Sequence, residues 1–176
     1  TGLDLPGELR GTLPSTEWKK KTYKKPEQQR WYGGETISLG IGQGYNTFTM
    51  LQLANATATL ANGGTHHQPR LVVATQDPIQ RVDRSVMNTP PVNLGFKPEH
   101  VEVIKQGLIG VAKDGTAARV FAGTTYQSAG KTGTAQAVTI GQKDKYNASK
   151  LEEHQRDHAL YMAFAPADNP KIALAI

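Results

Sequence analysis

Hydrophobic residues recur at helical spacing in two segments of the chain. In the first, Thr49 and Gln52 form a capping-box pattern and Asn62-Gly63-Gly64 provides a stop; the apolar stripe between them is Leu53, Ala56, Leu60 and Ala61. In the second, Pro98 suits the first helical position and Gly115-Thr116-Ala117 ends the pattern; its apolar positions are Val101, Ile104, Leu108, Val111 and Ala112. We therefore predict two core helices.

Other segments have the alternating or continuously apolar pattern of strands. Residues 159–165 and 171–176 flank the turn-forming stretch Pro166-Ala-Asp-Asn-Pro170 and predict a hairpin. Residues 71–75 predict a further strand that ends at an Asp-Pro turn, and residues 35–39 predict a short one. Residues 1–34 are rich in Gly and Pro, so we expect them to form loops.

A polar insertion between residues 141 and 157 predicts a short surface helix. Ser149 and Glu152 have the spacing of a capping box, and Glu152 with Arg156 is a favourable i,i+4 pair. His154 and His158 are also four residues apart and could place two zinc ligands on one helical face. A third ligand is not evident, and we predict no metal site.

The composition is that of one globular domain. The chain has 176 residues, of which 38% are hydrophobic and 20% charged, and it contains no cysteine, which excludes disulfides and thiolate metal sites. No apolar run reaches the roughly 18 residues that span a membrane. The net charge of +5 is concentrated in residues 19–30, where aromatic residues are interleaved with lysines. Without a nucleic-acid fold motif, we interpret this basic stretch as a solvated loop and predict no nucleic-acid partner.

The segment around Lys131-Thr132-Gly133-Thr134 carries the most specific chemistry. Small, hydroxyl and glycine residues favour an exposed edge strand over a helix. In an extended chain Thr132 and Thr134 share one face, and Lys131 and Gly133 share the other. Gly133 lets a substrate backbone come close to the strand. Two hydroxyls near an ammonium suit a carboxylate, and a backbone N–H beside them could stabilise an oxyanion.

Two nucleotide-binding motifs fit the glycine-rich segments poorly. A phosphate-binding loop ending in Gly130-Lys131-Thr132 needs glycine at position 125, which is Thr125. The dinucleotide fingerprint needs glycine at position 45 after Gly40-Ile-Gly42, and that position is Tyr45. We therefore expect no nucleotide cofactor. For both segments, a plain turn without a binding function remains an alternative interpretation.

Five segments occur in the order found in the transpeptidase domain of class B penicillin-binding proteins. They are TGLDLPGE from Thr1, GIGQGY from Gly40, LQLAN from Leu51, KTGTAQ from Lys131, and the stretch from Arg156-Asp-His158 to Ala163-Phe-Ala-Pro166. The chain resembles this family over almost its whole length, and most of all its elongation-specific type in Gram-negative bacteria. The resemblance implies an α+β fold, with an antiparallel sheet packed with helices, as in serine β-lactamases.

The resemblance also implies an activity and roles for residues. The expected reaction is D,D-transpeptidation: a serine takes the penultimate D-Ala carbonyl of a peptidoglycan stem peptide, and β-lactams acylate the same serine. Lys131 and the N–H of Thr134 would be catalytic, and Thr132, Gly133 and Thr134 would bind the D-Ala-D-Ala substrate. Supporting positions in the cleft wall would be Gly42, Gln43, Gly44 and Thr116. The chemistry needs no cofactor.

The family's S-x-x-K and S-x-N motifs are not found at usable positions. Ser128-Ala-Gly-Lys131 matches S-x-x-K literally, but residues three apart on a strand point to opposite faces, so we reject Ser128 as nucleophile. Residues 1–176 therefore resemble the later part of a transpeptidase domain. The resemblance implies that the upstream half of the same domain is a partner of this chain. A non-catalytic penicillin-binding scaffold and a class A β-lactamase remain alternatives. The resemblance further implies a periplasmic domain on the bacterial inner membrane and a glycan polymerase partner of the elongation machinery.

Overall fold

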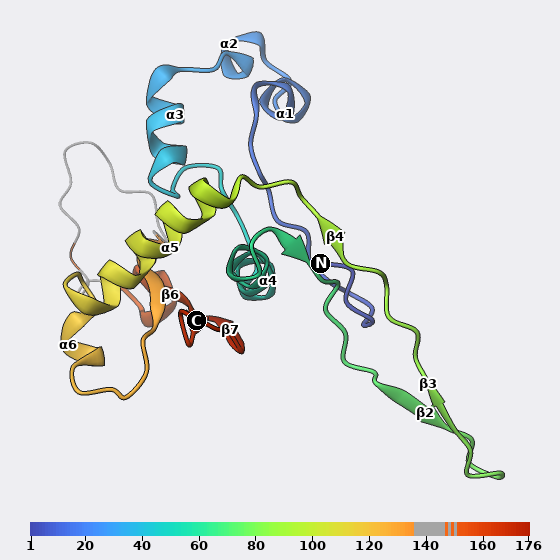
Figure 1. Cartoon of the computed structure of the whole chain (residues 1–176). Coiled ribbons are helices and arrows are strands. Elements are labelled where there is room, and N and C mark those ends of the chain that lie inside the picture. Colours follow the sequence, from blue (N-terminus) through green and yellow to red (C-terminus); the bar gives the residue numbers. More distant parts are fainter. Residues whose placement is uncertain (136–146, 148, 150) are drawn as a thin grey trace. The chain divides into compact units, whose positions relative to one another are not determined.

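The computed structural model describes residues 1–135, 147, 149 and 151–176 (Figure 1). These residues form two compact units. The first unit contains Thr1–Leu9, Thr49–Lys131 and Met162–Ile176, and the second contains Arg10–Phe48 and Thr132–Tyr161. Both units are therefore assembled from segments that are far apart in the sequence.

The first unit contains both helices predicted from the sequence, but the predicted core positions Ala56 and Ile104 are exposed. Helix α4 is Met50–Ala61; the Thr49 hydroxyl accepts from Gln52 N at 3.1 Å, and the Gln52 side chain accepts from Thr49 N at 3.0 Å. Helix α5 is Pro98–Lys113, with proline at its first position. A short helix that was not predicted, α6 (Ala118–Phe121), follows α5. The mixture of helices and antiparallel strands confirms the α+β class.

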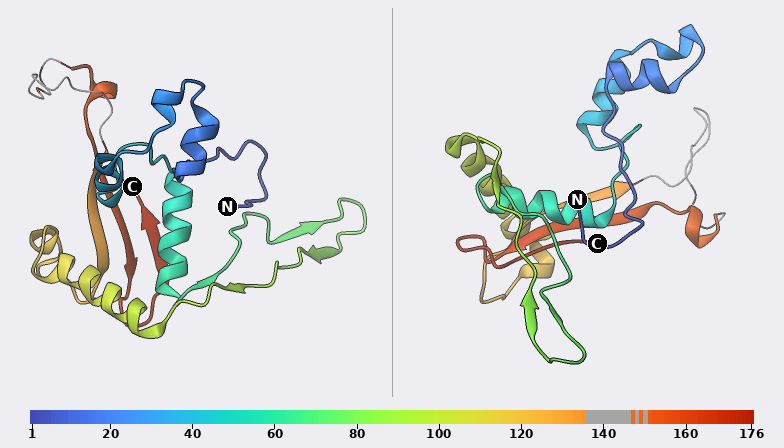
Figure 2. Two further views of the ribbon diagram at one scale, coloured as in Figure 1. Left: turned by 90° about the horizontal axis from the view of Figure 1, so that it is seen from above. Right: turned by 90° about the vertical axis from the view of Figure 1, so that its right-hand side faces the viewer.

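A three-stranded sheet has the order β5-β6-β7, and its strands lie side by side in Figure 2. The strands are β5 (Ala129–Ala135), β6 (His158–Ala165) and β7 (Ile172–Ala175). Strands β6 and β7 pair antiparallel, with Ala163 opposite Leu174, which confirms the predicted hairpin. Helix α4 packs against β7. The core is centred on Phe164, 1% exposed, with Ala61, Ala129 and Ala167 buried around it.

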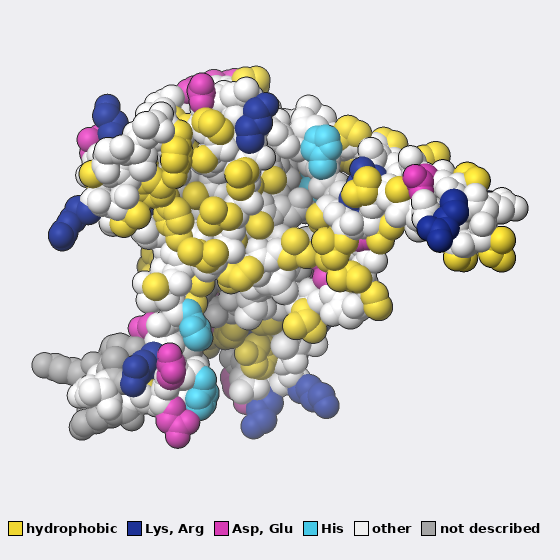
Figure 3. Space-filling model, turned by 90° about the horizontal axis from the view of Figure 1, so that it is seen from below, with side chains coloured by type: hydrophobic (Ala, Val, Ile, Leu, Met, Phe, Trp, Pro, Cys, Tyr) yellow, Lys and Arg dark blue, Asp and Glu magenta, His cyan; other side chains and the backbone are white. Residues whose placement is uncertain are grey.

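Two small antiparallel pairs complete the first unit. Strand β1 (Thr65–His66) pairs with β4 (Val92–Asn93), and β2 (Ala74–Gln76) pairs with β3 (Asp83–Ser85). The β2–β3 hairpin is the right-hand projection in Figure 3 and exposes apolar side chains, among them Ile79 and Val82.

The strand predicted over residues 71–75 is wrong for its first half. Strand β2 begins only at Ala74. The N–H groups of Leu71 and Val72 donate to the Asp4 carboxylate, at 2.7 and 2.8 Å. The side chain of Asp4, 67 residues away in the sequence, thus accepts the hydrogen bond that a neighbouring strand would otherwise accept from Leu71. The same hydrogen bonds lower the pKa of Asp4.

The second unit contains three helices that replace predicted loops and a predicted strand. They are α1 (Thr16–Thr22), α2 (Pro26–Gln29) and α3 (Gly33–Gly40). Helix α1 begins where the Ser15 hydroxyl accepts from Trp18 N at 3.0 Å. The strand predicted over residues 35–39 is wrong because Glu35, in the first turn of α3, accepts from Tyr32 N at 2.8 Å and caps a helix there.

The described part of the polar insertion contains a 3₁₀ turn, η2 (Glu153–Gln155). The predicted Ser149–Glu152 capping box is wrong: the Gln155 side chain accepts from Glu152 N at 3.4 Å, and Ser149 bonds with Asn147 instead. The predicted Glu152–Arg156 ion pair is also wrong, since Arg156 donates to the Leu151 carbonyl oxygen at 3.2 Å. Among the described residues, no helix combines the length and apolar character needed to cross a bilayer.

Candidate active site

The Lys131-Thr132-Gly133-Thr134 segment lies on β5, one of the two outer strands of the three-stranded sheet. This confirms the predicted edge strand for the part of the chain that the structure describes. The strand enters from the core, where Ala129 and Gly130 are buried, and emerges at Lys131, which is exposed. The motif therefore stands at the point where the strand leaves the core and is anchored firmly at one end.

The two faces of the motif differ as strand geometry requires. Lys131 and Gly133 alternate with Thr132 and Thr134, so each pair shares a face. Thr132 is half-buried, whereas Gly133 and Thr134 are exposed. A Cβ added to Gly133 would lie 3.6 Å from Leu160 Cβ, an ordinary contact. The neighbouring strand therefore does not require glycine at this position.

Ser128 is placed where it cannot act with Lys131. It is 4% exposed and immediately precedes β5, while Lys131 lies within the strand. The helical turn that brings positions i and i+3 of an S-x-x-K motif together is absent between these two described residues. The structure confirms the geometric reason for rejecting Ser128 as nucleophile.

The glycine-rich segment at residues 40–44 forms turns directly after α3. Gly42 and Gly44 have φ values of +79° and +76°, which favour glycine. The Gln43 N–H donates to the Ser38 carbonyl oxygen at 2.9 Å, so the segment folds back on the end of α3. This segment and residues 132–134 belong to the same compact unit. The role of Gly42, Gln43 and Gly44 in a cleft wall stays a prediction.

Thr116 is exposed between α5 and α6 in the first unit. The preceding Gly115 is required by packing, because a Cβ there would lie 2.8 Å from Val111 Cα. The Ala117 N–H donates to the Val111 carbonyl oxygen at 3.0 Å, which closes the end of α5. A helix stop accounts for this segment, and a supporting role for Thr116 stays a prediction.

Comparison with known proteins identifies the family of this strand-and-helix arrangement. A family model described as the penicillin binding protein transpeptidase domain matches residues 1–176. The chain belongs to the penicillin-binding protein transpeptidase family. The peptidoglycan D,D-transpeptidase MrdA of Escherichia coli strain K12 is 42% identical over 178 residues, which cover 100% of this chain and 27% of that protein. The chain thus spans about a quarter of the length of this relative.

Two solved structures of PBP2 proteins resemble this transpeptidase-family chain. Pseudomonas aeruginosa PBP2 in complex with WCK 5153 matches with a TM-score of 0.75 and 38% identity, over 99% of this chain and 34% of that one. Helicobacter pylori PBP2 in a complex with MreC matches with a TM-score of 0.71 and 30% identity, over 99% of this chain and 28% of that one. The elongation-type resemblance deduced from the ordered motifs is therefore confirmed.

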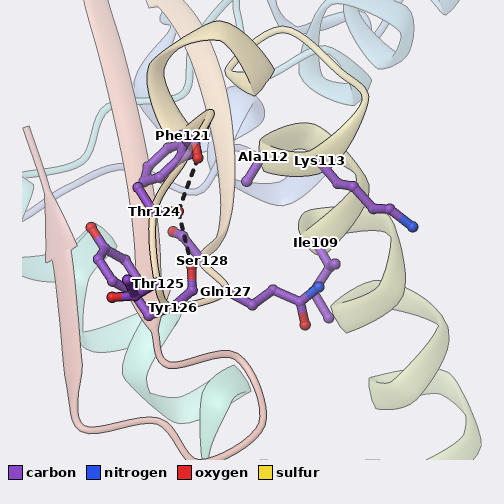
Figure 4. A pocket seen from close by; sticks show the side chains of 9 residues that line it. All are labelled: Ile109, Ala112, Lys113, Phe121, Thr124, Thr125, Tyr126, Gln127 and Ser128. Atoms are coloured by element: carbon purple, nitrogen blue, oxygen red, sulfur yellow. Dashed lines mark hydrogen bonds between the residues drawn. The ribbon is translucent and has the colours of Figure 1, made fainter.

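The transpeptidase-family chain has a cavity of about 290 Å³ at the start of β5 (Figure 4). It is lined by Ile109, Ala112, Lys113, Phe121, Thr124, Thr125, Tyr126, Gln127 and Ser128. The Thr124 hydroxyl bonds with the carbonyl oxygens of Phe121 and Tyr126, at 2.9 and 3.0 Å, and the Lys113 side chain extends away from the others. The lining includes none of residues 131–134, so this cavity is separate from the K-T-G motif.

The paired histidines of the insertion do not share a helical face. His154 lies in η2, 3.5 Å from a Glu152 carboxylate oxygen, while His158 opens β6. The predicted i,i+4 geometry is therefore wrong. Within residues 1–135, 147, 149 and 151–176, no group of three or more His, Cys, Asp or Glu side chains could hold a metal ion.

Sequence reasoning missed a buried cluster in the basic stretch. Lys19 is 4% exposed and pairs with Glu35, whereas the stretch was interpreted as a solvated loop. Burial and hydrogen bonds with Tyr23 and Glu35 raise the pKa of Tyr45 in the same cluster to about 12. The signal available in the sequence was the interleaving of aromatic residues with lysines, which can form cation–π contacts.

Proposed function

We propose that this chain is part of a peptidoglycan D,D-transpeptidase and supplies its substrate-binding strand. The observation that carries the proposal is the K-T-G motif on the outer strand of the sheet, in a chain of the penicillin-binding protein transpeptidase family. The name of the E. coli relative supports the reaction type. An outer strand suits a peptide substrate because an extended peptide can pair along its open side.

The reaction has two steps, and neither needs a cofactor. A serine Oγ attacks the penultimate D-Ala carbonyl carbon; an ester forms, the peptide C–N bond breaks, and the terminal D-Ala leaves with a proton on its amine. An amine of a neighbouring stem peptide then attacks the ester and releases the serine. We propose that the serine comes from another part of the protein, since Ser128 is buried and lacks the required helical turn.

In this scheme the residues of β5 bind the negatively charged groups of the substrate and stabilise the charge that develops during the reaction. Lys131 supplies positive charge beside the reacting serine. The hydroxyls of Thr132 and Thr134 bind the terminal carboxylate of the stem peptide, or the corresponding carboxylate of a β-lactam. The N–H of Thr134 stabilises the oxyanion that develops on the attacked carbonyl. Gly133 keeps the strand accessible to the substrate backbone.

The cellular setting of the enzyme is part of the same proposal. We propose a domain in the periplasm, attached to the inner membrane, that cross-links stem peptides during cell-wall elongation together with a glycan polymerase. The complex of the H. pylori relative with MreC supports the proposal that the enzyme acts within a multiprotein assembly. β-Lactams are the expected inhibitors.

Intact mass spectrometry of the full-length protein, before and after addition of a β-lactam, tests the proposal. We expect one acyl adduct on the protein and none on a peptide from this chain. A Thr134→Pro variant lacks the N–H and should lose acylation, because removing one oxyanion donor costs a factor of about 100 to 1,000 in rate. Thr134→Ala keeps the N–H and loses only the hydroxyl, so the difference in acylation rate between Thr134→Pro and Thr134→Ala isolates the contribution of the N–H.

Each outcome points to a definite conclusion. Circular dichroism shows whether the proline variant is folded. Unchanged acylation of a folded Thr134→Pro variant would refute the oxyanion role. No labelling of the wild-type protein would indicate a non-catalytic scaffold, and rapid loss of the adduct would indicate a β-lactamase.

A further inference from the structure

One lysine of the basic stretch is buried. Lys19 is 4% exposed, whereas Lys20, next to it on α1, is exposed. The Lys19 ammonium donates to the Arg30 carbonyl oxygen at 2.8 Å and also to the Glu35 carboxylate. Since a buried charge is costly without partners, this arrangement joins three segments firmly: α1, the end of α2 and the first turn of α3.

Aromatic rings surround the Lys19 ammonium. Its Nζ lies 5.9 Å from the ring centre of Trp31, 5.3 Å from that of Tyr32 and 5.6 Å from that of Tyr45. The Tyr45 ring also contacts Trp18, with 5.2 Å between ring centres. Cation–π attraction is strongest for a cation removed from water, as Lys19 is. The ammonium is therefore the common centre of the cluster.

This cluster holds both ends of the glycine-rich segment at residues 40–44. Glu35 lies on α3, which runs into Gly40, and Tyr45 follows Gly44 directly. A Cβ added to Gly42 would have no neighbour within 4 Å, and the Gly42 N–H donates to the Leu39 carbonyl oxygen at 3.0 Å. The Asn46 side chain also donates to the carbonyl oxygens of Leu39 and Gln43, at 3.5 and 3.4 Å, so the position of the segment depends on the elements before and after it. Lys19 contacts both.

The segment and the outer part of β5 belong to the same compact unit. In both views of Figure 2, the C-terminal end of α3 lies near the C-terminal end of β5. We propose that Lys19 is a positioning residue for substrate binding. By fixing both ends of residues 40–44, it holds the peptide groups of this segment beside Thr132 and Thr134, where they contact the backbone of the stem peptide. The inference rests on the proposed function of β5.

A Lys19→Met variant of the full-length protein tests this role, because methionine keeps an apolar stem but removes the ammonium. The rate of acylation is measured against β-lactam concentration. We expect the half-saturating concentration to rise about 10-fold, with the maximal rate nearly unchanged, because binding geometry and not chemistry is disturbed. Hydrogen exchange at the amides of residues 41–45 should become faster relative to exchange in α4. Lys20→Met, on the exposed side of α1, should match wild type in both measurements.

The outcomes separate a positioning role from a structural one. A folded Lys19→Met variant with wild-type half-saturation and wild-type exchange at residues 41–45 overturns the proposal, even if its Tm is lower. Should Lys19→Met not fold, Glu35→Gln provides the same two readouts, since the amide keeps size and an acceptor but loses the charge. If the wild-type protein is not acylated at all, the proposed function fails instead. Hydrogen exchange then still shows whether Lys19 fixes the segment.

Discussion

Replacing Gly133 by alanine would separate the stability of β5 from its use as a docking strand. The backbone at Gly133 lies outside the left-handed region, and an added Cβ would meet Leu160 Cβ at 3.6 Å. Alanine at such a compatible site stabilises a protein by about 0.4–1 kcal/mol, because the unfolded chain loses conformational freedom. For a domain of this size we therefore expect Tm to rise by about 1–4 °C.

The same methyl group should impair acylation. It would project from the backbone of β5 between Thr132 and Thr134, at the point where the substrate backbone is proposed to come close to the strand. The substrate must then shift by roughly 1 Å or more, and a shift of about 1 Å can cost about 100-fold in rate. We expect the second-order rate constant for acylation by a β-lactam to fall about 100-fold while the protein becomes more stable.

Thermal unfolding and the time course of labelling by a fluorescent β-lactam, both on the full-length protein, measure the two effects. Gly107→Ala is a matched control: it lies exposed on α5, its Cβ would have no neighbour within 4 Å, and alanine is favoured over glycine in helices. It should raise Tm without changing acylation. If Gly133→Ala is stabilised and still acylated at the wild-type rate, the substrate does not approach β5 as proposed.

Three further changes test the core, the carboxylate site and the buried ion pair. Phe164→Ala, at a site that is 1% exposed, should lower the free energy of unfolding by about 3–5 kcal/mol in urea titrations, whereas a small loss would mean that Phe164 does not centre the core. Thr132→Val should weaken binding of carboxylate-bearing β-lactams about 10- to 100-fold in competition assays, and equal binding would remove its hydroxyl from the carboxylate site. Hydrogen bonds from Lys19 and from the Tyr32 N–H lower the pKa of Glu35 below its usual 4.5. Ionised Glu35 therefore stabilises the folded state fully above about pH 4.5, and this contribution to the free energy of unfolding is lost as the pH falls through the lowered pKa. Unfolding measured at several acidic pH values should therefore show a shallower acid loss for Glu35→Gln than for wild type, and parallel curves would contradict this.

Local chemistry accounts for the elements that the sequence predicted well. Thr49 and Gln52 cap α4 with atoms three residues apart, and the predicted hairpin needs only two strands and the short turn between them. These signals act over a few residues, so they can be read without knowing the rest of the chain.

Long-range contacts explain the elements that were missed. The segment at residues 35–39 has strand-like composition, yet it is helical: Glu35 caps the helix locally by accepting from Tyr32 N, and it is also bonded to Lys19, which is 16 residues away. The Asp4 carboxylate similarly takes the Leu71 N–H from the predicted strand, across 67 residues. The hydrophobic pattern and the local propensities of a segment do not reveal such distant partners, and contacts with these partners can override the local propensities.

For the candidate site, the sequence by itself determined the K-T-G motif, its strand periodicity and the family that it resembles. The edge position of this strand was also predicted. Only the tertiary structure decided that β6 is the strand beside β5, that Ser128 is buried before β5, and that Lys19 is enclosed by aromatic rings. The reason is physical: side-chain alternation is a property of a single extended chain, whereas edge position and burial depend on which distant segments pack beside it.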